Sequence, residues 1–320
     1  MPVIEPGARV AYSGEPGAFA EDAVLAAFER PVPVPVPGFR QVFEAVTAGC
    51  VPGDPAGAAP VVAGVVPIEN LVNGTVRENY DLLLEHDLAV TGEVVVPVRL
   101  CLAALPGQSL DEIERVYSHI QALGQAEAFL RTRPWTLLTT YNTAGAAKMI
   151  VDRGERAAAA VVSPRAAAGY GLEVLAGDIQ QVPDNRTRFL LIARHGGRPA
   201  SRVAASGATN LPGVTDASGA TNPSGATDAP GAAPAPMRTT MVLAVRNEPG
   251  SLHRCLGVFA RAGLNMSKLE SRPSHDRAWE YVFWVDLDAD ERQAAQAAAD
   301  LSSDAAMVRI LGTYRRAPEE

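Results

Sequence analysis

Between residues 9 and 194, short runs rich in β-branched residues alternate with stretches whose apolar residues recur at helical spacing. This alternation predicts an α/β fold with a mainly parallel sheet and helices on its faces. The segment is long enough for one doubly wound domain or for two lobes around a cleft, and the pattern is compatible with both. Strands are predicted over 9–14, 61–68, 87–105 and 157–164, and helices over 19–30, 39–49, 120–133 and 143–154.

A change of composition then separates two ordered parts of the chain. Residues 197–236 contain no aromatic residue and repeat a hexad that includes glycine. Such a hexad can form a left-handed β-helix, but this segment has few bulky aliphatic residues to fill its core. The prediction is therefore a flexible, disordered linker. The recurring glycines are Gly207, Gly213, Gly219, Gly225 and Gly231.

After the linker, the pattern predicts a compact β-α-β-β-α-β module of the α+β ferredoxin-like type. No cluster of catalytic residue types occurs in it, which favours a binding or regulatory role. Its strands are predicted over 239–247, 264–273, 279–289 and 307–314, and its helices over 249–263 and 290–303.

Composition narrows the function classes. The 320 residues carry a formal net charge of −8 without any run of basic residues, which argues against nucleic-acid binding. The start of the chain lacks the features of a secretory signal, and no apolar run approaches the roughly 20 residues of a membrane helix. Cys50, Cys101 and Cys255 form no Cys-x-x-Cys pair, so a cytoplasmic location is expected. The five histidines lack metal-ligand spacing, and we expect a site without metal or cofactor.

Two polar segments lie where strands should lead into helices. In the first, Gly14 and Gly17 precede a helix expected to begin near Ala18, whose N-terminus would favour an anion. An ordinary turn explains these glycines equally well. In the second, Glu69 and Asn70 follow a buried strand and suit hydrogen bonding to a hydroxyl or a carboxylate. On the residues alone, a helix cap or an ion pair with Arg77 explains Glu69 slightly better.

Two further segments have a complete structural explanation. Ser118 and Gln121 match a capping box, although His119 and Gln121 could also face a cleft. Asn142 is a plausible helix N-cap, and the small residues at 143–147 allow close approach of a ligand or a packed element.

The segment 183–197 poses a sharper question. Arg186, Thr187 and Arg188 lead into the apolar run 189–193, so a hydroxyl stands between two guanidinium groups at the start of a predicted strand. Such positions present side chains to ligands. The same arrangement is also common by chance on protein surfaces.

Five motifs occur in one order along the chain: VPIENLVNGTV at 66–76, SHIQAL at 118–123, TAGAA at 143–147, GLEVLAGDIQQVPDNRTRF at 171–189 and ESRP at 270–273. Taken together they are more specific than any one of them. In this order they resemble the prephenate dehydratase family, including its plant-type branch that acts on arogenate. The resemblance covers nearly all of 9–194 and 239–314.

The resemblance implies a catalytic domain over 8–195, with two lobes of the periplasmic-binding-protein type around a cleft, and an ACT domain over 237–316. The linker at 197–236 is longer than is usual in the family. Prephenate would be converted to phenylpyruvate in L-phenylalanine biosynthesis, with feedback by phenylalanine bound to the ACT domain. ACT modules commonly pair, so a homo-oligomer, at least a dimer, is expected. Arogenate as the substrate and a non-catalytic amino-acid sensor are the alternatives.

Site residues follow from the same resemblance. Thr187 is implied as the catalytic residue. The implied ligand-binding residues form two sets, one for the substrate and one for the effector. The substrate set is Glu69, Asn70, Ser118, Gln121, Thr143, Asn185, Arg188 and Phe189, and the effector set is Pro249, Gly250, Ser251, Leu252, Asn265, Glu270, Ser271, Arg272 and Pro273.

Several positions depart from the family's pattern, which puts substrate preference in doubt more than the type of reaction. Hydroxyl, thiol or proline positions of the family are replaced by Ala18, Ala20, Leu71, Ile120, Ala126 and Asn142.

The reaction requires departure of a ring hydroxyl, for which we expect Thr187 to donate a hydrogen bond. Arg188 or Arg186 would then hold a substrate carboxylate, with Lys148 as a less favoured candidate. The Asn185 amide would orient this loop.

Overall fold

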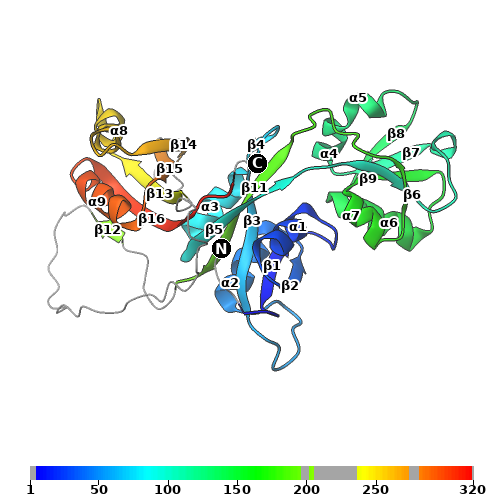
Figure 1. Cartoon of the computed structure of the whole chain (residues 1–320), viewed down its shortest axis with the longest axis horizontal. Helices are drawn as coiled ribbons and strands as arrows, with labels where there is room; N and C mark the ends of the chain where they lie inside the picture. Colours follow the sequence, from blue (N-terminus) through cyan, green and yellow to red (C-terminus); the bar gives the residue numbers. More distant parts are fainter. Residues whose placement is uncertain (1–4, 196–201, 205–235, 274–280, 319–320) are drawn as a thin grey trace, which may run out of the picture. The chain divides into compact units, whose positions relative to one another are not determined.

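The structure is a computed structural model that describes residues 5–195, 202–204, 236–273 and 281–318. The chain forms two compact units, residues 1–200 with 317–320 and residues 201–316. The first unit contains two sheets, each with its own helices, which we call the first and the second lobe (Figure 1). Among the described helices, none has the length and the apolar character needed to cross a membrane.

The first lobe is built on a mixed sheet. Its elements are β1 (Arg9–Ser13), α1 (Phe19–Ala27), β2 (Val32–Val36), α2 (Phe39–Ala48), β3 (Val61–Asn70), β4 (Gly74–Thr75), α3 (Arg77–Glu85), β5 (Leu88–Pro97) and β11 (Arg186–Arg194). The strand order is β2-β1-β3-β11-β5, with β4 paired to β3. The helix α2 packs closely on β3, because a side chain at Gly64 would lie within 3 Å of Val42 and Val46.

The prediction of a mainly parallel sheet is wrong. β1 is parallel to both β2 and β3, but β11 is antiparallel to both β3 and β5. The chain leaves the first lobe after β5 and returns through β11, so β11 enters the sheet from the opposite end. Strands joined by such a return need no helical crossover, which is the connection that the alternating pattern implied.

The second lobe is also a mixed sheet, in the order β10-β6-β9-β7-β8. The predicted helix over 120–133 is divided at Ala126 into two short helices. The elements of this lobe are β6 (Cys101–Ala104), a 3₁₀ turn (Leu110–Glu112), β7 (Arg115–Ser118), α4 (Ile120–Gln125), α5 (Glu127–Leu130), β8 (Thr136–Thr139), α6 (Thr143–Arg153), β9 (Ala158–Val162), α7 (Pro164–Gly169) and β10 (Glu173–Ala176).

Two predicted helix starts in this lobe have different outcomes. Asn142 caps α6 as expected, since its side-chain oxygen accepts the N–H of Gly145 at 2.6 Å. The predicted capping box of Ser118 and Gln121 is wrong. The N-cap of α4 is His119, whose ring accepts the N–H of Gln121 at 3.4 Å, because the strand β7 continues through Ser118.

The second unit is the predicted ferredoxin-like fold. Its elements are β12 (Arg202–Ala204), β13 (Met237–Val245), α8 (Ser251–Arg261), β14 (Asn265–Pro273), β15 (Tyr281–Asp288), α9 (Glu291–Leu301) and β16 (Ala305–Arg315). All ladders in the sheet, ordered β12-β16-β13-β15-β14, are antiparallel. The core lies between this sheet and α8 and α9, where Met241, Phe259 and Leu301 are buried.

The linker prediction fails at one point. Residues 202–204 form β12 and pair with β16, so this part of 197–236 belongs to the sheet of the second unit. The backbone hydrogen bonds of a strand explain why a composition rich in small residues can still be ordered here. The hexads from Gly207 to Gly231 lie outside the described residues.

Candidate functional site

A cavity of about 700 Å³ lies between the two lobes of the first unit. We call it the main cavity. The first lobe lines it with the ends of β1 and β3 and the start of β11, and the second lobe lines it with the starts of α4 and α6. Residues from distant parts of the sequence thus surround one space, as the cleft implied by the family resemblance requires.

Helix N-termini converge on the main cavity. Residues at the starts of α1, α2, α3 and α6 all line it. The N-cap residues of α1 and α2, Ala18 and Gly38, provide no side-chain cap for the first-turn N–H groups. Uncapped N–H groups and the positive ends of helix dipoles favour an anion. The cavity is therefore suited to a negatively charged ligand.

Among the described residues that line the main cavity, Arg77 is the one arginine or lysine, and it stands next to Glu78. It stands at the first residue of α3 and makes no ion pair or hydrogen bond with any residue in the described part of the chain. The sequence analysis considered Arg77 only as a partner for Glu69. Its place at a helix start, directly after the turn at Asn73 and Gly74, was the available signal that it could bind an anion.

Asn70 organises the polar groups at the end of β3. Its side-chain oxygen accepts the backbone N–H groups of Val72 and Asn73 at 3.1 and 2.9 Å. Because an amide has one oxygen and one nitrogen, these two bonds determine which way the side chain is turned. The amide nitrogen lies 2.9 Å from both Thr187 Oγ1 and Asn185 Oδ1.

This network determines the direction of the Thr187 hydroxyl. The Asn70 NH₂ group can only donate, and Thr187 Oγ1 is one of its three acceptors, with Asn185 Oδ1 and the carbonyl oxygen of Arg186 at 3.1 Å. The O–H of Thr187 is then left to donate, and no acceptor for it occurs among the described residues. Thr187 lines the main cavity and is 9% exposed. The sequence therefore brings a hydroxyl to the cavity wall with its donor unused.

Arg188 does not share the cavity with Thr187. Thr187 and Phe189 line the cavity, whereas Arg188 lies on the other face of β11, because successive residues of a strand point to opposite sides. There it forms ion pairs with Glu93 at 3.2 Å and with Glu69 at 3.6 Å. The interpretation of Arg188 as an anchor beside Thr187 is thus wrong in this structure, and Glu69 is likewise absent from the cavity lining.

Some of the other predicted substrate residues line the main cavity, and others do not. Gln121 and Thr143 line the main cavity, at the starts of α4 and α6. Ser118 does not, since it is fully buried and its hydroxyl donates to the carbonyl oxygen of Val161 at 2.6 Å. His119 also lines the cavity, and burial lowers the pKa of its imidazole below the ordinary value. Arg186 pairs with Asp184 at the surface.

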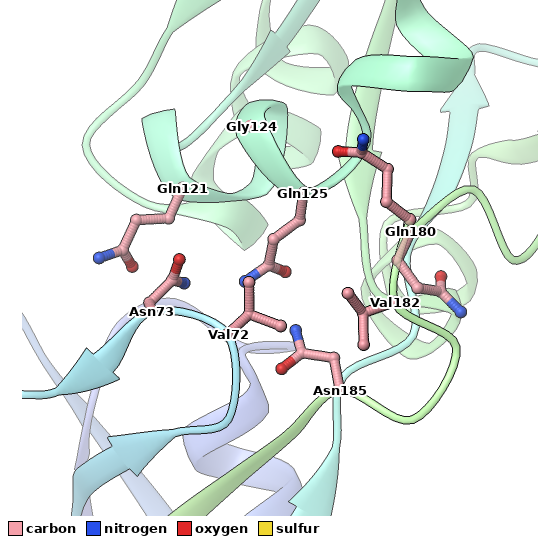
Figure 2. A pocket seen from close by; sticks show the side chains of 9 residues that line it. Val72, Asn73, Gln121, Gly124, Gln125, Gln180, Val182 and Asn185 are labelled. Atoms are coloured by element: carbon pink, nitrogen blue, oxygen red, sulfur yellow. The ribbon is translucent and has the colours of Figure 1, made fainter.

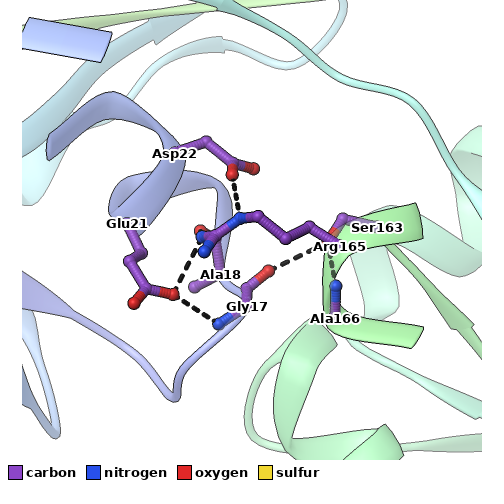
Figure 3. Close-up of polar contacts among 7 residues, drawn as sticks. All are labelled: Gly17, Ala18, Glu21, Asp22, Ser163, Arg165 and Ala166. Atoms are coloured by element: carbon purple, nitrogen blue, oxygen red, sulfur yellow. Dashed lines mark hydrogen bonds and ion pairs between the residues drawn. The ribbon is translucent and has the colours of Figure 1, made fainter. Parts of the chain in front are cut away.

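Polar contacts join the two lobes where α1 and α7 begin (Figure 3). Arg165 of the second lobe forms ion pairs with Glu21 and Asp22 of α1, the first of them at 2.8 Å. Ser163 donates to the carbonyl oxygen of Gly17 at 2.9 Å. Burial raises the pKa of Asp22, and the charge of Arg165 opposes this shift. These contacts hold the segment before α1 against the start of α7.

Glu15 adds a second set of contacts between the lobes. Its carboxylate accepts from the Tyr141 hydroxyl at 3.0 Å and pairs with the Lys148 ammonium at 3.1 Å. The hydrogen bond to Glu15 raises the pKa of Lys148. Lys148, the less favoured candidate for a substrate carboxylate, is therefore already engaged by an acid of the protein.

The second unit carries a separate pocket of about 210 Å³ at the start of α8. Gly250, Ser251 and Leu252 line it, and α8 has no side-chain cap there. Tyr281 and Phe283 of β15 complete one wall. These two residues pair in the sheet with Pro273 and Ser271 of β14, which places the ESRP motif at 270–273 beside the pocket.

Asn265 is not brought to this pocket. It stands at the opposite end of β14 from Pro273 and donates to Asp288 Oδ2 at 2.6 Å. No group of side chains that could hold a metal ion occurs among the described residues of either unit.

Comparisons with known proteins give a consistent result. The model of the prephenate dehydratase family matches residues 10–197, and that of the ACT domain matches residues 239–303. A chloroplastic arogenate dehydratase/prephenate dehydratase of Arabidopsis thaliana is 35% identical over 317 residues, or 96% of this chain and 72% of that protein.

Two solved structures are similar over almost their whole length. Prephenate dehydratase from Arthrobacter aurescens in complex with L-Phe has a TM-score of 0.73 and 28% identity, over 96% of this chain and 90% of its own. The quorum-quenching acylase GqqA has a TM-score of 0.75 and 28% identity, over 97% of this chain and 98% of its own.

Proposed function

The chain belongs to the prephenate dehydratase family and carries an ACT domain, and from its cavity we propose that it catalyses the decarboxylating dehydration of prephenate. A single observation carries this proposal. Asn70 turns the Thr187 hydroxyl into an unused hydrogen-bond donor at the wall of an anion-favouring cavity. A doubly negative substrate with a hydroxyl leaving group suits both features.

In the proposed reaction, the bond between the ring and its carboxylate breaks and carbon dioxide leaves. The electron pair of that bond moves through the ring and expels the hydroxyl on the opposite carbon, so that the ring becomes aromatic. The departing oxygen takes one proton from solvent and leaves as water, and the product is phenylpyruvate. Thr187 donates a hydrogen bond to this oxygen as negative charge develops on it, which typically contributes a factor of about 10²–10⁴.

Arogenate is the second candidate substrate, because the Arabidopsis relative carries both names. The two substrates differ only in the side chain, which bears a keto group in prephenate and an amino group in arogenate. The decisive assay incubates the purified chain with each in turn. Phenylpyruvate from prephenate supports the first proposal, and phenylalanine from arogenate supports the second. If neither product forms, the non-catalytic amino-acid sensor is the remaining interpretation.

Feedback by phenylalanine is the proposed role of the ACT domain. The pocket at the start of α8 offers uncapped N–H groups to a carboxylate and an aromatic wall from Tyr281 and Phe283. Of the effector residues inferred from the family, Gly250, Ser251 and Leu252 support this location. Calorimetry of the whole protein with L-phenylalanine should show binding, and a flat trace at millimolar ligand would remove this proposal.

Domain limits, assembly and location complete the proposal. The catalytic domain would span 8–195 and the ACT domain 237–316, and paired ACT domains would form a homodimer or a larger oligomer. Three free cysteines, of which Cys101 and Cys255 are buried, suit a reducing compartment such as the cytoplasm. Light scattering of the purified protein tests the assembly directly.

A further inference from the structure

A second pocket of about 210 Å³ adjoins the main cavity, with which it shares Asn73, Gln121 and Gln125 (Figure 2). Most of its lining residues are asparagine or glutamine, and we call it the amide pocket. Val72 and Val182 supply an apolar wall, and none of the described residues in the lining carries a charge. The amide pocket therefore offers hydrogen bonds in neutral surroundings, whereas the main cavity contains Arg77.

Asn185 holds an unused donor at the wall of the amide pocket (Figure 2). Its side-chain oxygen accepts from the Asn70 NH₂ group, whose orientation is determined by two backbone N–H groups. The Asn185 amide therefore cannot be turned the other way without placing two donors face to face. Its own NH₂ group is buried without a partner among the described residues, in a residue that is only 1% exposed. A buried donor of this kind is costly unless a ligand uses it.

Gln180 contributes a second donor of known direction. Its side-chain oxygen accepts the backbone N–H of Leu100 at 2.9 Å, and the residue is 9% exposed. The remaining hydrogen-bonding group of this side chain is its NH₂, at the wall of the amide pocket. Two oriented NH₂ groups without a cation suit a ligand group that only accepts, such as a carboxylate.

We propose that the amide pocket binds the ring carboxylate that leaves as carbon dioxide, while Arg77 binds the carboxylate that the product retains. This inference rests on the proposed dehydratase function. The departing carboxylate loses its charge in the transition state, so a cation beside it would stabilise the substrate more than the transition state. Neutral amides also hold the carboxylate in place, but they stabilise the substrate over the transition state less than a cation would. The retained carboxylate keeps its charge throughout, and a guanidinium can bind it without slowing the reaction.

The amide pocket lies close to Thr187. Asn185 Oδ1 and Thr187 Oγ1 both lie 2.9 Å from the same nitrogen of Asn70. Asn185 lines the amide pocket and Thr187 lines the main cavity. One substrate in the two adjoining spaces could therefore place its ring carboxylate at the amide pocket and its hydroxyl at Thr187.

The test compares substrate and product in the same variants. Asn185→Asp and Gln125→Glu each place a negative charge in the amide pocket with little change of shape. We expect each to lower kcat/KM for prephenate about 10- to 100-fold, because a carboxylate meets repulsion where it met a donor. Phenylpyruvate lacks the ring carboxylate, so its inhibition constant should stay within about twofold of wild type. Arg77→Met should weaken phenylpyruvate inhibition about tenfold or more.

The outcomes separate this inference from the function on which it rests. Two outcomes would overturn the assignment of the amide pocket. In the first, Asn185→Asp and Gln125→Glu weaken inhibition by phenylpyruvate as much as they reduce kcat/KM for prephenate. In the second, both variants leave kcat/KM for prephenate unchanged. If Asn185→Asp does not fold, the half-buried Gln125 decides alone. A wild-type protein without activity on prephenate or arogenate would instead refute the proposed function.

Discussion

Asn70 determines the direction of the hydrogen bonds at this site. Asn70→Asp keeps its shape but replaces the NH₂ donor with an oxygen, so Thr187 would donate to the new carboxylate and lose its free O–H. We expect kcat to fall about 10²- to 10³-fold, the range seen when one transition-state donor is removed. Asn79→Asp is the matched control, since its buried amide donates to Pro67 and does not contact Thr187. Equal losses of kcat in the two folded variants would contradict this role.

The sequence could identify the site motifs but not the face of the strand on which each residue lies. Thr187 and Asn70 reach the cavity as the family resemblance implied. Arg188 was expected there because it adjoins Thr187, yet neighbours on a strand face opposite sides. Which face of β11 meets the cavity depends on how the strand packs between β3 and β5, and this has no local sequence signature. Asn142 was predicted correctly because an N-cap depends only on local sequence.

At the level of elements, Arg188 joins β11 to its two neighbouring strands. Its side chain is 14% exposed and pairs with Glu93, which is 1% exposed. Arg188→Met would remove a cation from this buried carboxylate, and we expect the free energy of unfolding to fall by about 3 kcal/mol. KM for the substrate should not change. Arg186→Met is the control on the same strand, because its partner Asp184 is exposed and the pair should contribute less than about 1 kcal/mol. Urea denaturation measures the free energy of unfolding of both variants. A rise in KM for Arg188→Met alone would support the earlier interpretation that Arg188 binds a substrate carboxylate.

The start of α4 should make stability depend on pH. Burial lowers the pKa of His119 from its ordinary value of 6.5, so the folded protein prefers the neutral ring that accepts from Gln121. This contribution is fully present above pH 6.5 and is lost as the pH falls through the lowered pKa, because the unfolded chain binds the proton more readily. His119→Asn keeps an acceptor at the N-cap without a titrating ring. Its free energy of unfolding should fall less than that of wild type between pH 7 and pH 5. If the free energy of unfolding changes with pH in the same way for the two proteins, His119 does not contribute to this pH dependence.

In the first unit as a whole, the cavity depends on contacts between the lobes. Arg165 pairs with two carboxylates of α1, and the approach is close enough that a side chain at Gly17 would lie 2.7 Å from Ala166. Arg165→Met should favour separation of the lobes and raise KM about 3- to 10-fold, because less of the protein has the cavity closed. Added salt should raise KM in wild type and have less effect in the variant. An unchanged KM at low salt would mean that these ion pairs do not control closure.

The overall architecture was predictable in part. Periodicity located most helices and strands, and it described the second unit as β-α-β-β-α-β. The sequence pattern was compatible with one domain or with two lobes, because periodicity does not say which strands pair. The return of β11 between β3 and β5 depends on contacts far apart in sequence. The strand β12 was missed because its pairing with β16 compensates for a composition that otherwise favours a linker.

The central claim is that the Thr187 hydroxyl, oriented by Asn70, assists departure of the ring hydroxyl. Steady-state kinetics with prephenate of Thr187→Val beside Thr187→Ser tests it most directly, because valine keeps the shape and serine keeps the donor. The account predicts that Thr187→Val loses about 10²- to 10⁴-fold in kcat with little change in KM, while Thr187→Ser retains most activity. A folded Thr187→Val protein with kcat close to that of wild type would contradict it.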